Sequence, residues 1–214
     1  MYKSIYVVIS KTQTKFARCI RYLGHLQYNH SALGLDADLN EFYAFSRPQH
    51  RAIFRGHLVR ETLDRYTLNR NHPVPVVVFQ LPVSQEQLER LKENIHKISC
   101  DPEYMYNLFS VLTFPFTHGF ATHKAYNCTE FVAHTLKELN FPLPKPAYEY
   151  RPDDFVKILE EYIIFTGDIR DYMRCTSTDE LYFEHYSIRM VYQNFVALLK
   201  IIKRTYFCRR KSNI

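Results

Sequence analysis

Two apolar runs constrain the fold more than any other feature of this sequence. SIYVVIS covers residues 4–10, and VPVVVFQL covers residues 74–81. Both runs are short, continuous and rich in β-branched residues, so they predict buried strands. Pro75 cannot donate a backbone hydrogen bond, and it therefore predicts a sheet edge or a bulge at the start of the second strand.

The rest of the chain predicts shorter strands and several helices. Further strands are predicted at residues 28–35, 41–46 and around 57–61, and a strand or turn at 163–171. The first two form a hairpin, because the intervening DADLN has turn chemistry. Helical spacing of apolar residues predicts helices at 12–23, 84–98, 128–139, 152–161 and 181–207. The pattern indicates an α+β fold, in which a small, mostly antiparallel sheet packs with helices.

Length and composition are typical of one domain with an appendage. The chain has 214 residues, of which 46% are hydrophobic, so it can bury a core without metal or disulfide staples. We expect a main domain at residues 1–178 and a basic amphipathic helix or tail at 179–214. The five cysteines are an odd number without a CxxC pair, which favours free thiols in a reducing compartment.

The predicted location is the cytoplasm. The start of the chain, MYKSIYVVIS, is too short and too polar for a signal peptide, and no run approaches the ~20 apolar residues of a membrane span. The net charge of +6 is concentrated near the end of the chain, and the remainder is close to neutral. We therefore expect no specific nucleic-acid partner.

Cys128 begins the most informative segment, YNCTEFVAHTL. Phe131, Val132, Thr135 and Leu136 form one apolar stripe, and Cys128 lies at its start, so its side chain is expected to point into the structure. It also lies in the first helical turn, where free N–H groups and the helix dipole favour a thiolate. A packed core cysteine and a nucleophile are both consistent with this position. Cys19 is expected to be buried, on the helix stripe formed by Phe16, Cys19, Ile20 and Leu23.

A histidine that opens a strand favours the catalytic interpretation. His30 begins HSALGLD, and alternation places it on the same face as Ala32 and Gly34. Small neighbours leave room beside an imidazole, which suits a cleft better than a packed core.

The ordered motifs HSALGLD, FYAFSR, GHLVRE, VVVFQLPVS and NCTEFVAHTL resemble the circularly permuted papain-fold hydrolases of the NlpC type. These include the YiiX-like group, with the lecithin:retinol acyltransferase-like proteins as relatives. The resemblance covers roughly residues 2–172, and the histidine precedes the cysteine, as in the permuted branch. It implies a permuted papain-like fold in which Cys128 is the nucleophile and His30 the general base.

The family also has a polar third residue that orients the histidine. Alignment of the hairpin places it near Ala44 or Ser46. Because alanine cannot do this, Ser46 is the predicted third catalytic residue, with Glu41 and Glu61 as possible substitutes. A Cys–His dyad can also act without a strong third member.

The predicted activity is that of a cysteine hydrolase that cleaves an amide in a peptide or acyl conjugate. An acyltransferase or thioesterase acting on lipid, and an inactive binding protein of the same fold, are the alternatives. No cofactor or metal is expected, since His118 and His123 are more typical of loop histidines than of ligands. An aromatic set lines a substrate groove or forms core: Tyr104, Tyr106, Phe109, Phe114, Phe116 and Phe120.

The end of the chain carries an apolar stripe on a basic helix. The stripe comprises Ile188, Val191, Phe195, Leu198, Leu199, Ile202 and Phe207, and no acid follows Glu184. One interpretation is a helix docked on the core by its apolar face. The other is an interfacial helix that contacts an anionic membrane.

Overall fold

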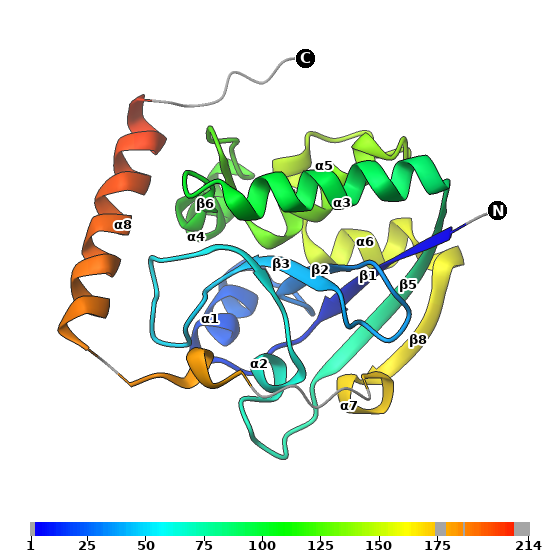
Figure 1. Ribbon diagram of the computed structural model, residues 1–214, viewed down its shortest axis with the longest axis horizontal. Helices are drawn as coiled ribbons and strands as arrows, with labels where there is room; N and C mark the ends of the chain where they lie inside the picture. Colours follow the sequence, from blue (N-terminus) through cyan, green and yellow to red (C-terminus); the bar gives the residue numbers. More distant parts are fainter. Residues whose placement is uncertain (1–2, 174–178, 186, 208–214) are drawn as a thin grey trace.

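A six-stranded antiparallel sheet organises the structure, a computed structural model that describes residues 3–173, 179–185 and 187–207. The strand order is β4-β3-β2-β1-β5-β8 (Figure 1). The strands are β1 Lys3–Ser10, β2 His30–Gly34, β3 Phe42–Ser46, β4 His57–Arg60, β5 Pro75–Val83 and β8 Ile163–Asp168. The predicted mixed α+β class and the antiparallel sheet are confirmed.

The two apolar runs form neighbouring strands in the middle of this sheet. In the β1–β5 register, Val7 lies opposite Phe79 and Ile5 opposite Leu81. β5 also pairs with β8, so it is an interior strand, and the expected edge at Pro75 is wrong. Pro75 is tolerated because it is the first residue of the strand, where its carbonyl accepts a bond from the N–H of Lys11.

Helices and short elements cover the sheet and join its strands. The helices are α1 Lys15–Gly24, α2 Leu63–Thr67, α3 Gln85–Cys100, α4 Leu108–Thr117, α5 Cys128–Glu138, α6 Pro152–Ile158, α7 Ile169–Tyr172 and α8 Ile188–Phe207. Three 3₁₀ turns are η1 Ala147–Glu149, η2 Glu160–Tyr162 and η3 Glu180–Phe183, and β6 Met105–Tyr106 pairs in parallel with β7 Ala125–Tyr126.

Side-chain alternation along the strands divides the core between the two faces of the sheet. Leu33 and Phe79 point to the face covered by α3, α5 and α6. Ala32 and Val78 point to the opposite face, where they pack with residues of α2 and α7. Figure 1 shows the two helical layers on either side of the sheet. The position of α5 over β2 and β3 brings its first residue close to the start of β2.

The expected buried stripe of the first helix is wrong. On α1 only Ala17 is buried, whereas Cys19 is exposed and Leu23 is 50% exposed. The reason is that α1 packs beside α4 rather than on the sheet. Its apolar residues therefore line a cavity between these helices instead of the core.

The final helix begins at Ile188 and packs on the domain through a face other than the predicted one. Met190 and Ile201 are buried, whereas Val191 and Phe195 of the predicted stripe are more than half exposed. The helix therefore docks on the domain, as one of the two interpretations expected, but most of the predicted stripe is not the docking face. In the part of the chain that the structure describes, no helix is long and apolar enough to cross a membrane.

Truncation of the central strand should destabilise the protein strongly. Phe79 is fully buried between β1 and the helices, so Phe79→Ala leaves a cavity and should lower the free energy of unfolding by about 3–5 kcal/mol. Gln80→Ala, at the exposed next position of the same strand, should change it by less than about 0.5 kcal/mol. Urea unfolding followed by circular dichroism measures both changes. Equal losses of unfolding free energy in the two variants would contradict the burial of Phe79 and the exposure of Gln80.

Candidate active site

Cys128 is the first residue of α5, and a side-chain cap fixes the start of this helix. The side-chain oxygen of Asn127 accepts a hydrogen bond of 2.8 Å from the backbone N–H of Glu130. Phe131 and Val132 anchor the helix in the core. Cys128 itself is 5% exposed and lies at the positive end of the helix dipole. This position combines burial with an electrostatic preference for the thiolate.

His30 is the first residue of β2, and it lies beside Cys128. The Ser31 and Thr129 hydroxyl oxygens are 3.2 Å apart, which joins β2 to the first turn of α5. The His30 imidazole and the Cys128 thiol interact, and each shifts the pKa of the other toward its charged form. The two residues that the sequence analysis paired are thus brought together from positions 98 residues apart (128 − 30).

The environment of this pair favours its charged form. Burial alone would raise the pKa of Cys128, but the charge and hydrogen bond of His30 and the backbone of Ser31 lower it below its usual value. Burial alone would also lower the pKa of His30. The charge and hydrogen bond of Cys128, followed by Glu61, raise it instead to about 10. Both shifts stabilise a thiolate–imidazolium pair.

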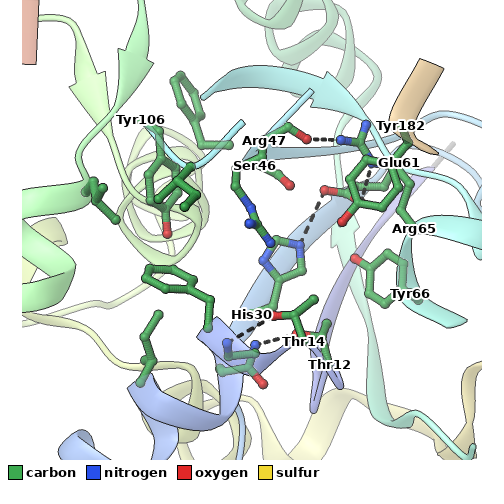
Figure 2. A pocket seen from close by; sticks show the side chains of 17 residues that line it. Thr12, Thr14, His30, Ser46, Arg47, Glu61, Arg65, Tyr66, Tyr106 and Tyr182 are labelled. Atoms are coloured by element: carbon green, nitrogen blue, oxygen red, sulfur yellow. Dashed lines mark hydrogen bonds and ion pairs between the residues drawn. The ribbon is translucent and has the colours of Figure 1, made fainter. Parts of the chain in front are cut away.

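Glu61 is the carboxylate that contacts the imidazole. It directly follows β4, and its Oε1 lies 3.5 Å from Nε2 of His30 (Figure 2). This is an ion-pair contact and not a hydrogen bond, and catalytic contacts are often this long before a substrate binds. Burial would raise the pKa of Glu61, but the charge of Arg65 and then the contact with His30 lower it. Glu61 is therefore ionised beside the imidazole.

Ser46 lines the same cavity as His30, but the residue in contact with the imidazole is Glu61. The Ser46 side chain makes a small contribution to the lowered pKa of Glu61, so it acts on Glu61. Ala44 is fully buried in the sheet, and Glu41 is exposed at the start of the returning strand. Glu61, considered above only as a substitute, is the group in contact with His30, because the chain returns through β4 to place a carboxylate on that side of the cleft.

Arg65 holds Glu61 from the other side. Its Nε lies 3.6 Å from Oε2 of Glu61, and its Nη1 lies 3.6 Å from Asp179. The guanidinium carbon lies 4.4 Å from the centre of the Tyr182 ring, and Nη2 donates to the carbonyl of Arg47. The segment after residue 178 therefore contributes directly to the walls of the site. The sequence analysis missed Arg65, although its four-residue spacing from Glu61 is a recognised ion-pair signal on helices.

Two tyrosines complete the surroundings of the pair. Tyr106 on β6 lines the same cavity as Cys128, and burial, followed by the Cys128 charge, raises the pKa of its hydroxyl well above the usual value. Tyr106 therefore keeps its proton and can donate it in a hydrogen bond. The Tyr66 ring lies 5.7 Å from the His30 ring, between centroids. The sequence predicted Tyr106 only as a member of a larger aromatic set.

A narrow cleft passes across the pair and has two unlike sides. On the His30 side, a cavity of about 80 Å³ is lined by polar and aromatic residues that include Glu61, Arg65, Tyr66 and Tyr182 (Figure 2). On the Cys128 side, a cavity of about 70 Å³ is mainly apolar; its lining includes Ile20, Leu23, Val111, Leu112 and Phe114. Ile20, Asn29 and Tyr106 line both cavities, so the two adjoin at these residues, with His30 in the first lining and Cys128 in the second.

A wider basic groove continues from the His30 side. It has a volume of about 790 Å³ and shares Thr14, Phe16, Arg47 and Ile53 with the polar cavity. Its basic residues are Lys15, Arg18, Arg47, Arg51 and Arg70, and among the described residues that line it there is no carboxylate. Burial and then the neighbouring arginines lower the pKa of His50 in this groove. The groove therefore favours an anionic group.

The described residues contain no group of three or more His, Cys, Asp or Glu side chains placed to hold a metal ion. Comparisons with protein-family models, curated proteins and solved structures found no match to this chain. The resemblance to permuted NlpC-type hydrolases therefore stays a hypothesis that rests on the motifs and the site geometry.

The Cys128 thiol should ionise more easily than an ordinary thiol. Its alkylation by iodoacetamide, followed by peptide mass spectrometry, should rise with pH through a midpoint below about 8.5. His30→Ala removes the main stabilising charge and should shift the midpoint upward. Exposed Cys19 is the internal reference for reagent activity. A midpoint at or above 8.5, or one that His30→Ala leaves unchanged, would contradict the coupling.

Removal of Arg65 should destabilise the protein, most strongly near neutral pH and less at acidic pH. Arg65→Met leaves Glu61 buried without its main cation, which should lower the free energy of unfolding by about 3–5 kcal/mol at pH 7. The lowered pKa of Glu61 gives stability that is present above its unfolded pKa and is lost as pH falls through the folded pKa. Without Arg65 the folded pKa of Glu61 rises, so the destabilisation caused by Arg65→Met should shrink as pH falls and Glu61 becomes protonated in both proteins.

Denaturant unfolding at a series of pH values from 4 to 8 measures this effect. Arg90→Met removes an exposed ion pair on α3 and is the matched control, with an expected change under about 0.5 kcal/mol. If Arg65→Met behaved like Arg90→Met at every pH, the buried network would have no role in stability.

Proposed function

We propose that this protein is a cysteine-dependent hydrolase that cleaves an amide bond in a peptide or acyl conjugate. The observation that carries the proposal is the row Cys128–His30–Glu61, which begins at a helix N-terminus and lies along a cleft. A nucleophile, a base and a group that orients the base are the parts that nucleophilic catalysis requires. A packed core cysteine needs neither an adjacent histidine nor a cavity.

In the first step, the Cys128 thiolate attacks the scissile carbonyl carbon and forms a carbon–sulfur bond. The electron pair of the carbonyl moves to oxygen and produces a tetrahedral oxyanion. His30, protonated in the resting pair, gives its proton to the leaving nitrogen as the carbon–nitrogen bond breaks. The products of this step are a thioester on Cys128, a free amine and a neutral imidazole.

The oxyanion requires hydrogen-bond donors next to Cys128. The backbone N–H groups of Cys128 and Thr129 belong to the first turn of α5, where amides have no partner within the helix. Tyr106 is protonated and lines the same cavity as Cys128, so its hydroxyl is our candidate for the side-chain donor. One such donor typically changes the rate by 10²–10³-fold.

In the second step, the neutral imidazole of His30 takes a proton from water, and the resulting hydroxide attacks the thioester. The carbon–sulfur bond breaks, the acid leaves, and the thiolate–imidazolium pair is restored. Glu61 does not exchange a proton in this cycle; it stabilises the imidazolium and holds its orientation.

Acyl transfer is a second candidate function, and the apolar cavity favours it. The side of the cleft next to Cys128 is lined mainly by apolar residues of α1 and α4. Such a wall accommodates a hydrocarbon acyl group, and it limits the access of water to a thioester. An amine or alcohol would then resolve the intermediate in place of water. The basic groove beyond His30 suits an anionic part of the substrate or acceptor.

A panel of fluorogenic amides and thioesters with acyl groups from acetyl to dodecanoyl tests the proposal. Cys128→Ala should abolish turnover, and Glu61→Gln, which keeps the shape of the side chain, should lower kcat by about 10²-fold or more. Tyr106→Phe should lower kcat with little change in KM. Ser110→Ala, at a buried position of α4 away from the cleft lining, is a control for structural change.

Hydroxylamine added to the reaction separates the two outcomes. Formation of hydroxamate at the expense of free acid indicates that acyl transfer competes with hydrolysis. Turnover that persists in Cys128→Ala, or a wild-type protein that neither turns over any substrate nor forms an acyl adduct on Cys128, would refute the proposed function.

A further inference from the structure

The outer face of α8 is apolar and exposed along most of the helix. Ile188 is 91% exposed, Phe195 57% and Leu199 50%. Val191, Tyr192 and Tyr206 are also exposed and extend the same face. These residues recur at three-, four- and seven-residue steps, so they form one stripe. We call this set of six residues the outer stripe.

The helix is held to the domain by its inner face, so the outer stripe is not needed for docking. Met190 and Ile201 are buried against the domain. The Asn194 side-chain oxygen accepts a bond of 3.1 Å from the backbone N–H of Phe54, and Arg55 donates a bond of 2.8 Å to Gln193. Figure 1 shows α8 at one side of the molecule, apart from the sheet. A helix with an apolar face on the side opposite its contacts requires an explanation other than core packing.

All formal charges on α8 are positive. The helix contains Arg189, Lys200, Lys203 and Arg204, and no acidic residue follows Glu184 in the sequence. Arg189, Lys200 and Lys203 are separated by eleven and three residues, which places them along one flank of the outer stripe. Arg204 is instead directed to the domain, where it approaches Glu103.

From these observations we infer that the outer stripe of α8 is a binding surface for an anionic membrane. Phe, Leu and Ile enter the boundary between headgroups and acyl chains, Tyr192 and Tyr206 suit the interface, and the flanking cations meet the lipid phosphates. A second copy of the chain is disfavoured as the occupant, because pairing two such faces would bring like charges together. The helix would lie on the membrane and not cross it, in agreement with its composition.

This inference does not depend on the proposed catalysis. Cys128→Ala should bind vesicles as the wild type does, because Cys128 is not part of α8. Membrane attachment would also bring lipid close to a cleft with an apolar wall. Vesicle binding can nevertheless be measured without any catalytic activity.

Co-sedimentation of the full chain with vesicles tests the surface. Vesicles of equal parts phosphatidylglycerol and phosphatidylcholine should bind the protein, pure phosphatidylcholine vesicles should bind it at least tenfold more weakly, and 0.5 M salt should weaken the anionic binding. Phe195→Asp/Leu199→Asp should reduce binding by more than tenfold. Lys200→Ala/Lys203→Ala should reduce it by about fivefold for each cation removed.

A matched variant controls for net charge. Lys92→Ala/Lys97→Ala removes two exposed cations from α3 and should bind as the wild type does. All the substituted side chains are exposed, so the thermal unfolding temperature of each variant should equal that of the wild type; this measurement separates a lost surface from a lost fold.

Three results would overturn the inference. The first is no binding to anionic vesicles at low salt. The second is binding that Phe195→Asp/Leu199→Asp leaves intact. The third is self-association in analytical ultracentrifugation that the same variant abolishes, because the outer stripe would then be an interface between copies of the chain.

Discussion

A row of buried groups with alternating charge determines the character of the site. Arg65 is positive, Glu61 negative, His30 positive when protonated, and Cys128 negative as a thiolate. Each charge would be costly to bury alone, and each is compensated by its neighbour. Cys128 makes the main contribution to the raised pKa of His30, and Glu61, itself kept ionised mainly by Arg65, adds to it.

The fold provides this row from separate parts of the chain. β2 supplies His30 at its first residue, the end of β4 supplies Glu61, and α2 supplies Arg65 four residues later. α5 crosses β2 and β3 with its N-terminus at the start of β2, so Cys128 meets the imidazole. The central strands β1 and β5 do not contribute catalytic groups. They form the middle of the sheet, and this fixes where the ends of β2 and β4 lie, which carry His30 and Glu61.

Local patterns in the sequence predicted the helices and strands better than the contacts between them. The buried strands followed from β-branched runs, and the position of Cys128 at a helix start followed from the apolar stripe. Glu61 could not be ranked above Ser46 or Glu41, because contact with His30 depends on how β4 and α2 return to the cleft. Tyr106 reaches Cys128 from a two-residue strand that has no periodic signal.

The amphipathic helices also show that the sequence predicts an element better than its tertiary contacts. Helical spacing correctly identified the stripes of α1 and α8, but a stripe does not state what covers it. In α1 it faces a cavity beside Cys128, and in α8 most of it faces outward. Apolar periodicity thus predicted the secondary structure, while tertiary packing decided which apolar face became core.

The protonation state of His30 tests the central coupling most directly. Nitrogen-15 NMR of histidine-labelled protein, with the His30 signal assigned by His30→Gln, distinguishes imidazolium from neutral imidazole. The raised pKa predicts that His30 is imidazolium at pH 8 in the wild type, and that its pKa falls in Cys128→Ala and in Glu61→Gln. A His30 that is neutral at pH 8 in the wild type, with a titration that neither substitution changes, would contradict the ion pair on which the proposed mechanism depends.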